Sequence, residues 1–307
     1  MKLIAVIAGA GVLWITAPAD AKLQIVATTP DFAAIARAIG GERVEVTSLA
    51  KGIQDPHFVD AKPSFIRLLN QADVLIEGGA DLEVGWLPPV LESARNPKLA
   101  AGAPGRVAAS AGVRLLQPAT PVDRSEGDVH PLGNPHYMLD PENSRAVADG
   151  IAAALCRLDA AGCGGYRANV AAWDQRLDQK LKEWTASMAP YRGVKVITYH
   201  DSWPYFARRF GLEIVDHVEP KPGIPPTPGH LEQLVDRITR EQVRVVIMEP
   251  YFSDRAPQLL AHKTGVAVLA LAPSVAPEAG IPDYFALFDQ DIARLVDALK
   301  RSPAERR

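Results

Sequence analysis

The sequence predicts an α/β fold of two lobes, each a parallel sheet flanked by helices, joined by a long linker helix. Buried-type strands alternate with amphipathic helices in both halves of the 307-residue chain, a pattern typical of parallel sheets covered on both faces. The longest helical pattern lies between these halves, and the chain is long enough for two domains. We therefore predict a first lobe at 22–160, a linker helix at 161–190 and a second lobe at 191–307.

In the first half, apolar periodicity and turn residues predict the elements of one lobe. Strands are predicted at 23–27, 44–49 and 72–76, and helices from about Phe32 to Ile39, at 63–71 and from Asp140 to about Leu158. Asp140 and Pro141 form a strong helix start, with aspartate as the N-cap and proline at the first helical position. Residues 117–135 are polar and turn-rich, and we interpret them as a loop.

The long helical pattern runs from Tyr166 to about Met188, with apolar residues at steps of four and three. A continuous helix of this length would exceed about 30 Å and could run along both lobes; a surface helix of one lobe is the alternative. In the second half, strands are predicted at 194–199, 214–215, 243–248 and 266–271, and helices at 202–210, 231–240, 257–264 and 284–300. Two such lobes place a ligand in the crevice at the carboxyl ends of the strands.

The first 21 residues predict that the protein is exported. Lys2 provides a positive start, residues 3–16 are apolar, and Ala19-Asp20-Ala21 has the small residues of a cleavage site. Residues 1–21 are therefore interpreted as a signal peptide. The apolar run is shorter than the roughly 20 residues that span a membrane, so a retained anchor is the weaker alternative. No cysteine follows the cleavage site at Lys22, which argues against a lipid anchor.

Composition and charge exclude one class of partner. The hydrophobic fraction of 48% is ample for two cores. The formal net charge is −3, and removal of the signal peptide would leave it unchanged because one lysine and one aspartate are lost with it. Such a weak charge argues against binding to nucleic acid.

The two cysteines, Cys156 and Cys163, lie near a predicted helix end. Seven residues of unbroken helix would separate their α-carbons by about 10.5 Å, which is too far for a disulfide bond. Residues 159–162 look like a helix end, and a turn there could bring the cysteines together. In an oxidising compartment we expect a local disulfide bond rather than free thiols.

Three histidines carry the strongest functional signal in the sequence. They occur as Asp55-Pro56-His57, Asn134-Pro135-His136 and Tyr199-His200-Asp201. His200 directly follows a buried-type strand, where α/β proteins place ligand-binding residues. His57 and His136 each follow a proline, which restricts the backbone. Three converging imidazoles would form a transition-metal site, and three unrelated loop histidines are the alternative.

Four other histidines, at positions 130, 217, 230 and 262, are expected to be exposed or structural. His130 is the exception, because it lies six residues from His136 in the same predicted loop. Catalytic interpretations are weak, since the chain has no nucleophile elbow, no His-Glu-x-x-His motif and no Gly-rich phosphate loop. The adjacent residues Tyr199 to Ser202 include the types found in a triad, but neighbours at a strand end cannot all face one another.

Over essentially its whole mature length, the chain resembles the metal-specific solute-binding proteins of ABC importers, the zinc and manganese group called cluster A-I. The motifs that carry this resemblance are Asp55-Pro56-His57, Lys62-Pro63-Ser64, the segment 71–76 with Gly79 and Glu83, the segments 133–137 and 139–141, the segments 199–206 and 219–223, and Glu249-Pro250. The resemblance implies two α/β lobes joined by a rigid linker helix, with one metal ion between them. It also implies periplasmic location and delivery of the ion to a membrane permease.

Carried over residue by residue, the resemblance implies that His57 and His136 are ligands from the first lobe and His200 the ligand from the second. Three histidines resemble the zinc type, whereas manganese members tend to replace one histidine by a carboxylate, consistent with the preference of that ion for oxygen. The chain departs from the family after its last strand, where the segment 269–274 has no aspartate. The fourth position is therefore assigned to water, to Glu249 or to an acid between Glu278 and Asp283.

The sequence thus predicts a receptor for Zn(II), acting as a monomer without enzymatic activity. Asp201 and Glu249 are the carboxylates expected to orient the imidazoles. A Mn(II) or broad-range receptor is the first alternative, and a zinc-dependent hydrolase, which also uses three imidazoles and a water, is the second. A metallochaperone that loads the site, and a metal-collecting role for His130, are further hypotheses.

Overall fold

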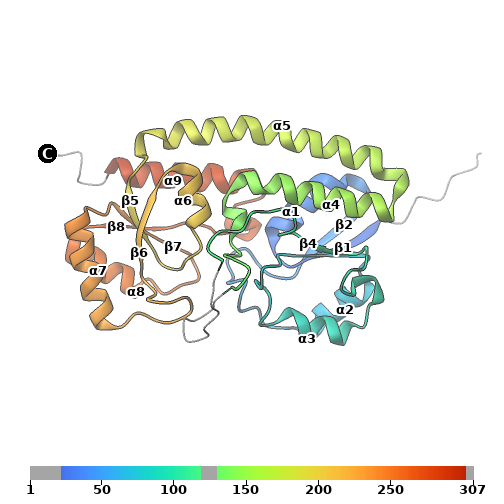
Figure 1. The fold of residues 1–307 in the computed structure, drawn as a ribbon, viewed down its shortest axis with the longest axis horizontal. Helices are drawn as coiled ribbons and strands as arrows, with labels where there is room; N and C mark the ends of the chain where they lie inside the picture. Colours follow the sequence, from blue (N-terminus) through green and yellow to red (C-terminus); the bar gives the residue numbers. More distant parts are fainter. Residues whose placement is uncertain (1–21, 119–129, 302–307) are drawn as a thin grey trace, which may run out of the picture.

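Two four-stranded parallel sheets lie side by side along the molecule, one formed by each half of the chain (Figure 1). The computed structural model describes residues 22–118 and 130–301. The first sheet contains β1 (Leu23–Ala27), β2 (Val44–Ser48), β3 (Val74–Glu77) and β4 (Arg106–Ala108). The second contains β5 (Lys195–Thr198), β6 (Glu213–His217), β7 (Val245–Met248) and β8 (Ala267–Ala270). Their orders, β2-β1-β3-β4 and β6-β5-β7-β8, are equivalent. The predicted two-lobed α/β fold is therefore confirmed.

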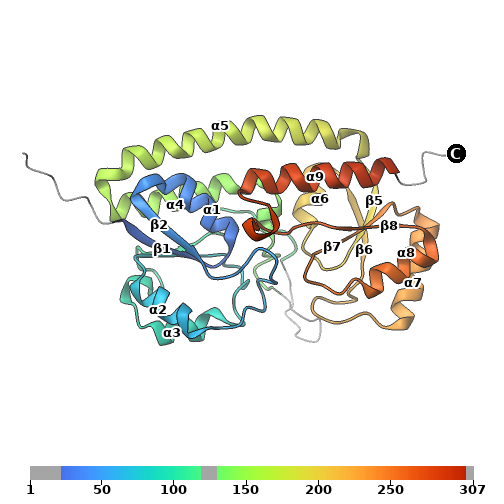
Figure 2. The same ribbon diagram turned by 180° about the vertical axis from the view of Figure 1, so that it is seen from behind.

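Helices cover both faces of each sheet. The first lobe contains α1 (Pro30–Gly40), α2 (Pro63–Gln71), α3 (Leu87–Ala94) and α4 (Ser144–Leu158). The second contains α6 (Pro204–Phe210), α7 (Pro228–Glu241), α8 (Arg255–Thr264) and α9 (Tyr284–Arg301). Short 3-10 turns lie at Gly41–Arg43, Pro97–Leu99, Tyr137–Leu139, Pro141–Asn143, Ala160–Gly162, Ala189–Tyr191 and Pro277–Ala279. Seen from either side, α1, α4, α6 and α9 lie above the sheets, and α2, α3, α7 and α8 lie below them (Figures 1 and 2).

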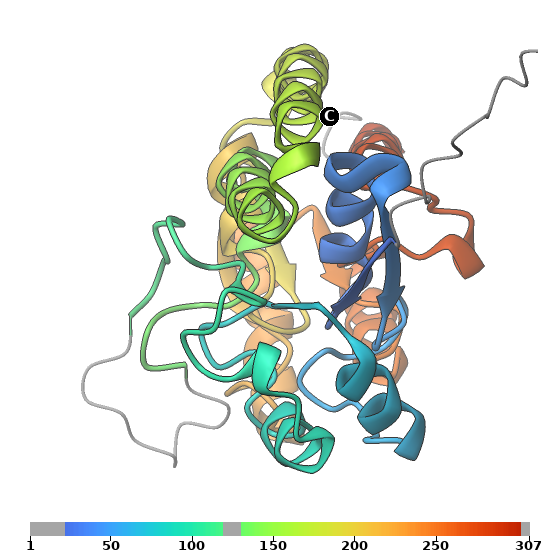
Figure 3. The same ribbon diagram turned by 90° about the vertical axis from the view of Figure 1, so that its right-hand side faces the viewer.

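The linker helix α5 (Cys163–Met188) has 26 residues and extends over both lobes (Figure 1). At about 1.5 Å per residue it is roughly 39 Å long. Its buried side chains are Tyr166, Trp173, Leu177, Trp184 and Met188, spaced by seven or four residues so that they share one face. This face packs on α4 in the first lobe and on α9 in the second. Seen along the molecule, α5 lies above α4 (Figure 3).

The cysteines form the predicted disulfide bond. Helix α4 ends at Leu158, a 3-10 turn follows, and α5 begins at Cys163, so the chain reverses between the two thiols. The sulfur atoms of Cys156 and Cys163 are 2.04 Å apart and the α-carbons 4.6 Å apart. Asp159 supports the turn, because its carboxylate accepts hydrogen bonds from the backbone N–H of Gly162 and from Arg43.

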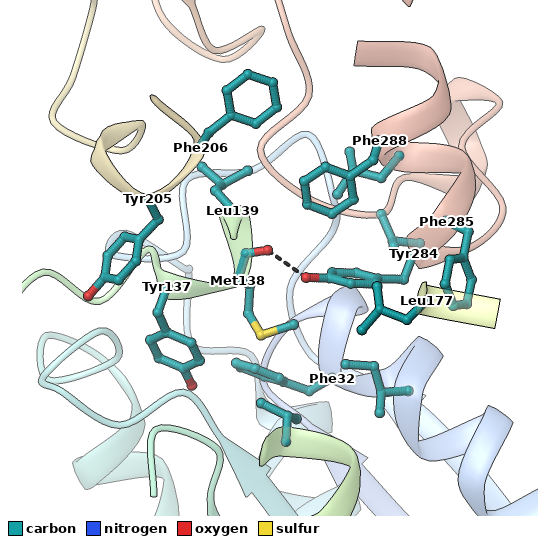
Figure 4. Close-up of a cluster of buried hydrophobic side chains, with 14 of the residues drawn as sticks. Phe32, Tyr137, Met138, Leu139, Leu177, Tyr205, Phe206, Tyr284, Phe285 and Phe288 are labelled. Carbon is teal, nitrogen blue, oxygen red and sulfur yellow. Dashed lines mark hydrogen bonds between the residues drawn. The ribbon is translucent and has the colours of Figure 1, made fainter. Parts of the chain in front are cut away.

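Aromatic side chains from both lobes form one continuous core between the sheets (Figure 4). The C-terminal helix α9 contributes Tyr284, Phe285 and Phe288, of which Phe285 and Phe288 pack on Trp184 of α5. The Tyr284 hydroxyl donates a hydrogen bond to the carbonyl of Met138, at 2.6 Å. Phe32 of α1 packs on the same cluster. The second lobe is thus attached to the first by packed side chains as well as by α5.

Two elements of the first lobe, α3 and β4, were not predicted. Helix α3 begins Leu87-Pro88-Pro89. Two adjacent prolines usually indicate the end of a helix, but prolines at the first helical positions are compatible with one. Strand β4 has only three residues, too few to show alternation. Asp140 does act as a cap, but for the turn Pro141–Asn143, and α4 begins only at Ser144.

No helix within 22–118 or 130–301 is long and apolar enough to cross a membrane. The predicted signal peptide, residues 1–21, lies outside the described residues. Most of the loop predicted at 117–135 also lies outside them, although His130 and the segment after it are described.

Candidate metal centre

The three histidines that the sequence singles out converge between the lobes. One ring nitrogen of each of His57, His136 and His200 lies within 4.8 Å of the others. The ring centroids of His57 and His136 are 5.0 Å apart, those of His57 and His200 5.6 Å, and those of His136 and His200 5.4 Å. Among the described residues this is the one group of histidine, cysteine and carboxylate side chains arranged so that it could hold a metal ion.

His57 is positioned by its own loop. The Asp55 carboxylate accepts a hydrogen bond from the backbone N–H of His57, and it lies 2.9 Å from the ring nitrogen Nδ1. Because a carboxylate can only accept, this contact places the ring proton on Nδ1. The Trp86 indole donates to the carbonyl of Pro56 and fixes the loop against α3. His57 Nε2 is buried and has no hydrogen-bond partner, so its lone pair is available to a ligand.

His136 is held by the same type of short-range contact. The Asn134 side chain accepts a hydrogen bond from the backbone N–H of His136, at 3.0 Å. Asn134 also bridges the lobes, because its amide donates to the carbonyl of Asp201 and its own carbonyl accepts from the Tyr205 hydroxyl. His136 Nε2 is buried without a partner, as in His57.

His200 is positioned by the second sheet. It follows β5, and its Nδ1 lies 2.7 Å from the carboxylate of Glu219, which follows β6. Thr198 pairs with His217 across these two strands, so positions 200 and 219 lie side by side two residues further on. The backbone N–H of Gly223 donates a second hydrogen bond to the Glu219 carboxylate. Nδ1 is therefore occupied, which leaves Nε2 as the ring nitrogen available to an ion.

Glu219 was not among the predicted site residues. It is 7% exposed and contacts His200 directly. The rule that identified His200, a polar residue directly after a buried strand, did not select Glu219, because β6 is only partly buried and ends at His217. The short apolar pattern at 214–215 concealed the true end of β6.

The electrostatic environment differs between His136 and His200. Burial and the neighbouring histidines hold the pKa of His136 well below its usual value. Burial lowers the pKa of His200, but the hydrogen bond to Glu219 and the nearby Glu249 outweigh it, so the net pKa is raised. Burial raises the pKa of Asp55, but its hydrogen bonds with His57 outweigh burial and the net pKa is lowered. Each lobe thus places a carboxylate behind one imidazole, Asp55 behind His57 and Glu219 behind His200.

The two carboxylates predicted to orient the imidazoles have other contacts. Glu249 is fully buried at the end of β7 and accepts a hydrogen bond from the Trp203 indole at 3.0 Å, while its Oε2 has no partner. Burial raises the pKa of Glu249 to about 7. The Asp201 carboxylate lies 3.6 Å from His217 Nε2 and 3.5 Å from the Asn134 amide. Neither residue belongs to the group of converging nitrogens.

His130 lies beside this group. Its ring centroid is 5.2 Å from that of His57, and both of its ring nitrogens are buried without a hydrogen-bond partner. Burial, reinforced by the nearby His57 and His200, lowers the pKa of His130 to about 4. Its nitrogens do not join the set that lies within 4.8 Å of one another.

A small pocket extends from His136 towards the segment where the sequence has no aspartate. It is lined from both lobes, by Asp31 among others in the first and by Tyr251, Pro273 and Ser274 in the second. The Asp31 carboxylate accepts a hydrogen bond from the backbone N–H of Val275, at 2.8 Å. The Ser274 hydroxyl is buried without a partner. The second lobe therefore offers no carboxylate to the ion from this segment.

These donors fit a borderline transition metal. Neutral imidazole nitrogens are preferred by zinc, copper and nickel, whereas carboxylate-rich sites suit manganese. The carboxylates behind His57 and His200 are of the kind that fix ring orientation and raise ligand basicity in metal sites. Three nitrogens leave a fourth position open for a further donor.

Comparison with known proteins gives one family for almost the whole described chain. The family model described as "ZnuA: Zinc-uptake complex component A periplasmic" matches residues 25–298. The manganese ABC transporter substrate-binding lipoprotein PsaA of Streptococcus anginosus is 24% identical over 288 residues, which cover 91% of this chain and 90% of that protein. The high-affinity zinc uptake system protein ZnuA of Brucella abortus is 28% identical over 165 residues, 54% of this chain and 48% of that protein.

Solved structures agree with this result. A crystal structure of ZnuA matches with a TM-score of 0.77 and 26% identity, over 90% of this chain and 99% of that chain. The solute-binding protein FpvC of Pseudomonas aeruginosa in complex with Mn²⁺ matches with a TM-score of 0.76 and 23% identity, over 91% of this chain and 98% of that one. The latter likeness supports the fold alone.

Proposed function

Because the chain belongs to the ZnuA family of periplasmic metal-uptake receptors, we propose that it captures Zn(II) and delivers the ion to the membrane permease of an ABC importer. The single observation that carries the choice of ion is the donor set. His57, His136 and His200 offer three imidazole nitrogens within 4.8 Å of one another, and no carboxylate joins them. Nitrogen donors of this kind favour zinc over manganese.

The proposal assigns a role to each residue around the ion. His57 and His136 bind it from the first lobe and His200 from the second, each through Nε2. Asp55 and Glu219 hold the rings of His57 and His200 and raise their basicity. Glu249 and Asp201 act further out: Glu249 supports the second lobe through Trp203, and Asp201 joins the lobes through Asn134.

The proposal extends to the cellular setting. The family is periplasmic by its description, and we propose that residues 1–21 direct export and are then removed. The S. anginosus relative is named a lipoprotein, whereas here the residue after the proposed cleavage site is Lys22, so no lipid is attached there. We further propose that the receptor is a monomer, catalyses no reaction, and can receive its ion from a metallochaperone.

The test is a titration of metal-free protein with Zn(II), Mn(II) and Cu(II) in competition with chelators. We expect submicromolar zinc binding that exceeds manganese binding. His200→Ala should weaken zinc binding by more than about 100-fold, because it removes a ligand and not only an outer contact, which alone costs about 10- to 100-fold. His262→Ala, an exposed histidine on α8, is the matched control and should bind as the unmodified protein does.

Two outcomes would contradict the proposal. Zinc binding that is weaker than micromolar, or that is unchanged by His200→Ala, would remove the assignment of the site. Manganese binding as strong as zinc binding would be consistent with a metal receptor but not with one for zinc alone. One of the relatives is named as part of a manganese transporter.

A further inference from the structure

We propose that His130 supplies a fourth imidazole to the bound ion and so completes an all-nitrogen site selective for zinc over manganese. This inference rests on the proposed function, because it adds a ligand to the three already assigned. It also gives a role to the fourth histidine near the centre and a fourth donor to the ion.

The first argument is the geometry of His130. Its ring centroid lies 5.2 Å from that of His57, within the range of 5.0 to 5.6 Å that separates the three assigned rings. Because His130 is outside the set of nitrogens within 4.8 Å, binding requires a movement of its ring towards the ion.

The second argument is that both ring nitrogens of His130 are buried and neither makes a hydrogen bond of normal geometry, although the backbone of Ala80 lies close enough to oppose the lowering of the ring's pKa by burial. A buried polar atom without a partner is costly and is usually explained by a ligand, water or ion. His57 Nε2 and His136 Nε2 are in the same state. One cation could satisfy one nitrogen of each of these three rings.

The third argument is how His130 is attached to the chain. Its carbonyl accepts a hydrogen bond from the backbone N–H of Gly133, at 3.0 Å, which closes a turn. Asn134 then donates to the carbonyl of Leu116 at 2.7 Å, and His136 follows. The turn therefore connects His130 to an anchored ligand and keeps its ring close to the other three.

The fourth argument is charge balance. Asp55 and Glu219 already place two carboxylates directly behind two ligands, which matches the charge of a divalent ion. A neutral fourth donor preserves this balance, whereas a carboxylate would add a buried negative charge. Glu249 is the main rival, because its Oε1 accepts from Trp203 but its Oε2 is buried without a partner; a Glu249→Gln variant distinguishes the two candidates. Ser274 offers only a neutral hydroxyl.

The experiment uses the mature protein loaded with zinc and compares His130→Ala with His262→Ala as the exposed control. X-ray absorption at the zinc edge should show four imidazole ligands in the unmodified protein and three in His130→Ala. Competition with chelators should show a loss of zinc affinity of at least about 10-fold in His130→Ala and no change in the control. Manganese affinity should change less than zinc affinity, because manganese gains little from nitrogen donors.

A second variant separates loss of a ligand from damage to the loop. In His130→Gly, free imidazole added to the solution should restore zinc affinity and the fourth nitrogen, which a purely structural histidine would not allow. Three imidazoles in the unmodified protein, or equal zinc affinity in His130→Ala, would overturn the proposal. So would loss of the fourth donor in Glu249→Gln but not in His130→Ala. Failure of the proposed function would look different, since the unmodified protein would then not bind zinc.

Discussion

The two lobes position their histidines in different ways. In the first lobe the contacts are local, because Asp55 holds His57 and Asn134 holds His136 across two residues of chain. In the second lobe the contact is long-range, because Glu219 is 19 residues from His200. The first lobe relies on short loop motifs with a proline before each histidine, and the second relies on the pairing of β5 with β6.

This difference indicates which side of the centre is more vulnerable to substitution. A local motif can form wherever its few residues are placed, so its geometry depends little on the rest of the lobe. A contact between neighbouring strands exists only when the sheet has the correct register. The second-lobe contact is also more enclosed, since the Glu219 side chain is 7% exposed and that of Asp55 is 20% exposed.

The largest effect of a substitution outside the ligands is therefore expected at Glu219. Glu219→Gln keeps the shape of the side chain but removes the negative charge behind His200, so the imidazole becomes less basic and its orientation less fixed. We expect zinc affinity to fall towards the upper end of the 10- to 100-fold range that is typical of such outer contacts. Competition with a chelator of known affinity measures this directly.

Glu213→Gln is the matched control, because Glu213 lies on β6, the strand that leads to Glu219, but is exposed. It should bind zinc as the unmodified protein does. If the zinc affinity of Glu219→Gln remained within about twofold of that of the unmodified protein, the contact between Glu219 and His200 would not be supporting the ligand.

Loss of the disulfide bond is expected to lower the stability of the protein without changing the zinc affinity of the metal centre. It joins α4 to the start of α5, and neither cysteine is among the residues that line the pocket beside His136. Replacing both cysteines by serine should reduce the free energy of unfolding by about 2 kcal/mol, as expected for so short a closed loop. Zinc affinity measured at a temperature where both proteins are folded should be unchanged.

Chemical denaturation monitored by circular dichroism gives the stability change, with and without a reducing agent. Reduction should destabilise the unmodified protein but leave the serine variant unaffected. A loss of zinc affinity in the folded serine variant would contradict this expectation, because it would show that the start of the linker helix influences the metal centre.

The contrast between local and long-range contacts also explains what could be predicted from the sequence. Most strands and helices followed from apolar periodicity, and the histidines of the first lobe stand in recognisable short motifs. The disulfide bond followed from a helix end between two cysteines. In contrast, α3 was concealed by its two prolines and β4 by its length of three residues, because neither shows a period long enough to detect.

The role of Glu219 could not be predicted, for a reason that lies in the register of the second sheet. Val196 pairs with Ile214, but a shift of one residue follows, and Ile197 pairs with Asp216. Without that shift, position 218, a valine, would lie beside His200, and the carboxylate would be displaced by one residue. A bulge of this kind depends on the packing of the whole sheet, which periodicity in a single strand does not reveal.

Of the two carboxylates behind the histidines, Asp55 is expected to have the smaller effect on zinc affinity. Asp55→Asn retains an oxygen that can accept from the backbone N–H of His57, so the turn that carries the histidine should persist. Only the charge behind the ring is lost, in a more exposed position. We therefore expect zinc affinity to fall by about 10-fold or less, and the same chelator competition measures it. An effect larger than that of Glu219→Gln would reverse the comparison and show that charge, rather than the length of chain between partners, decides how firmly each histidine is held.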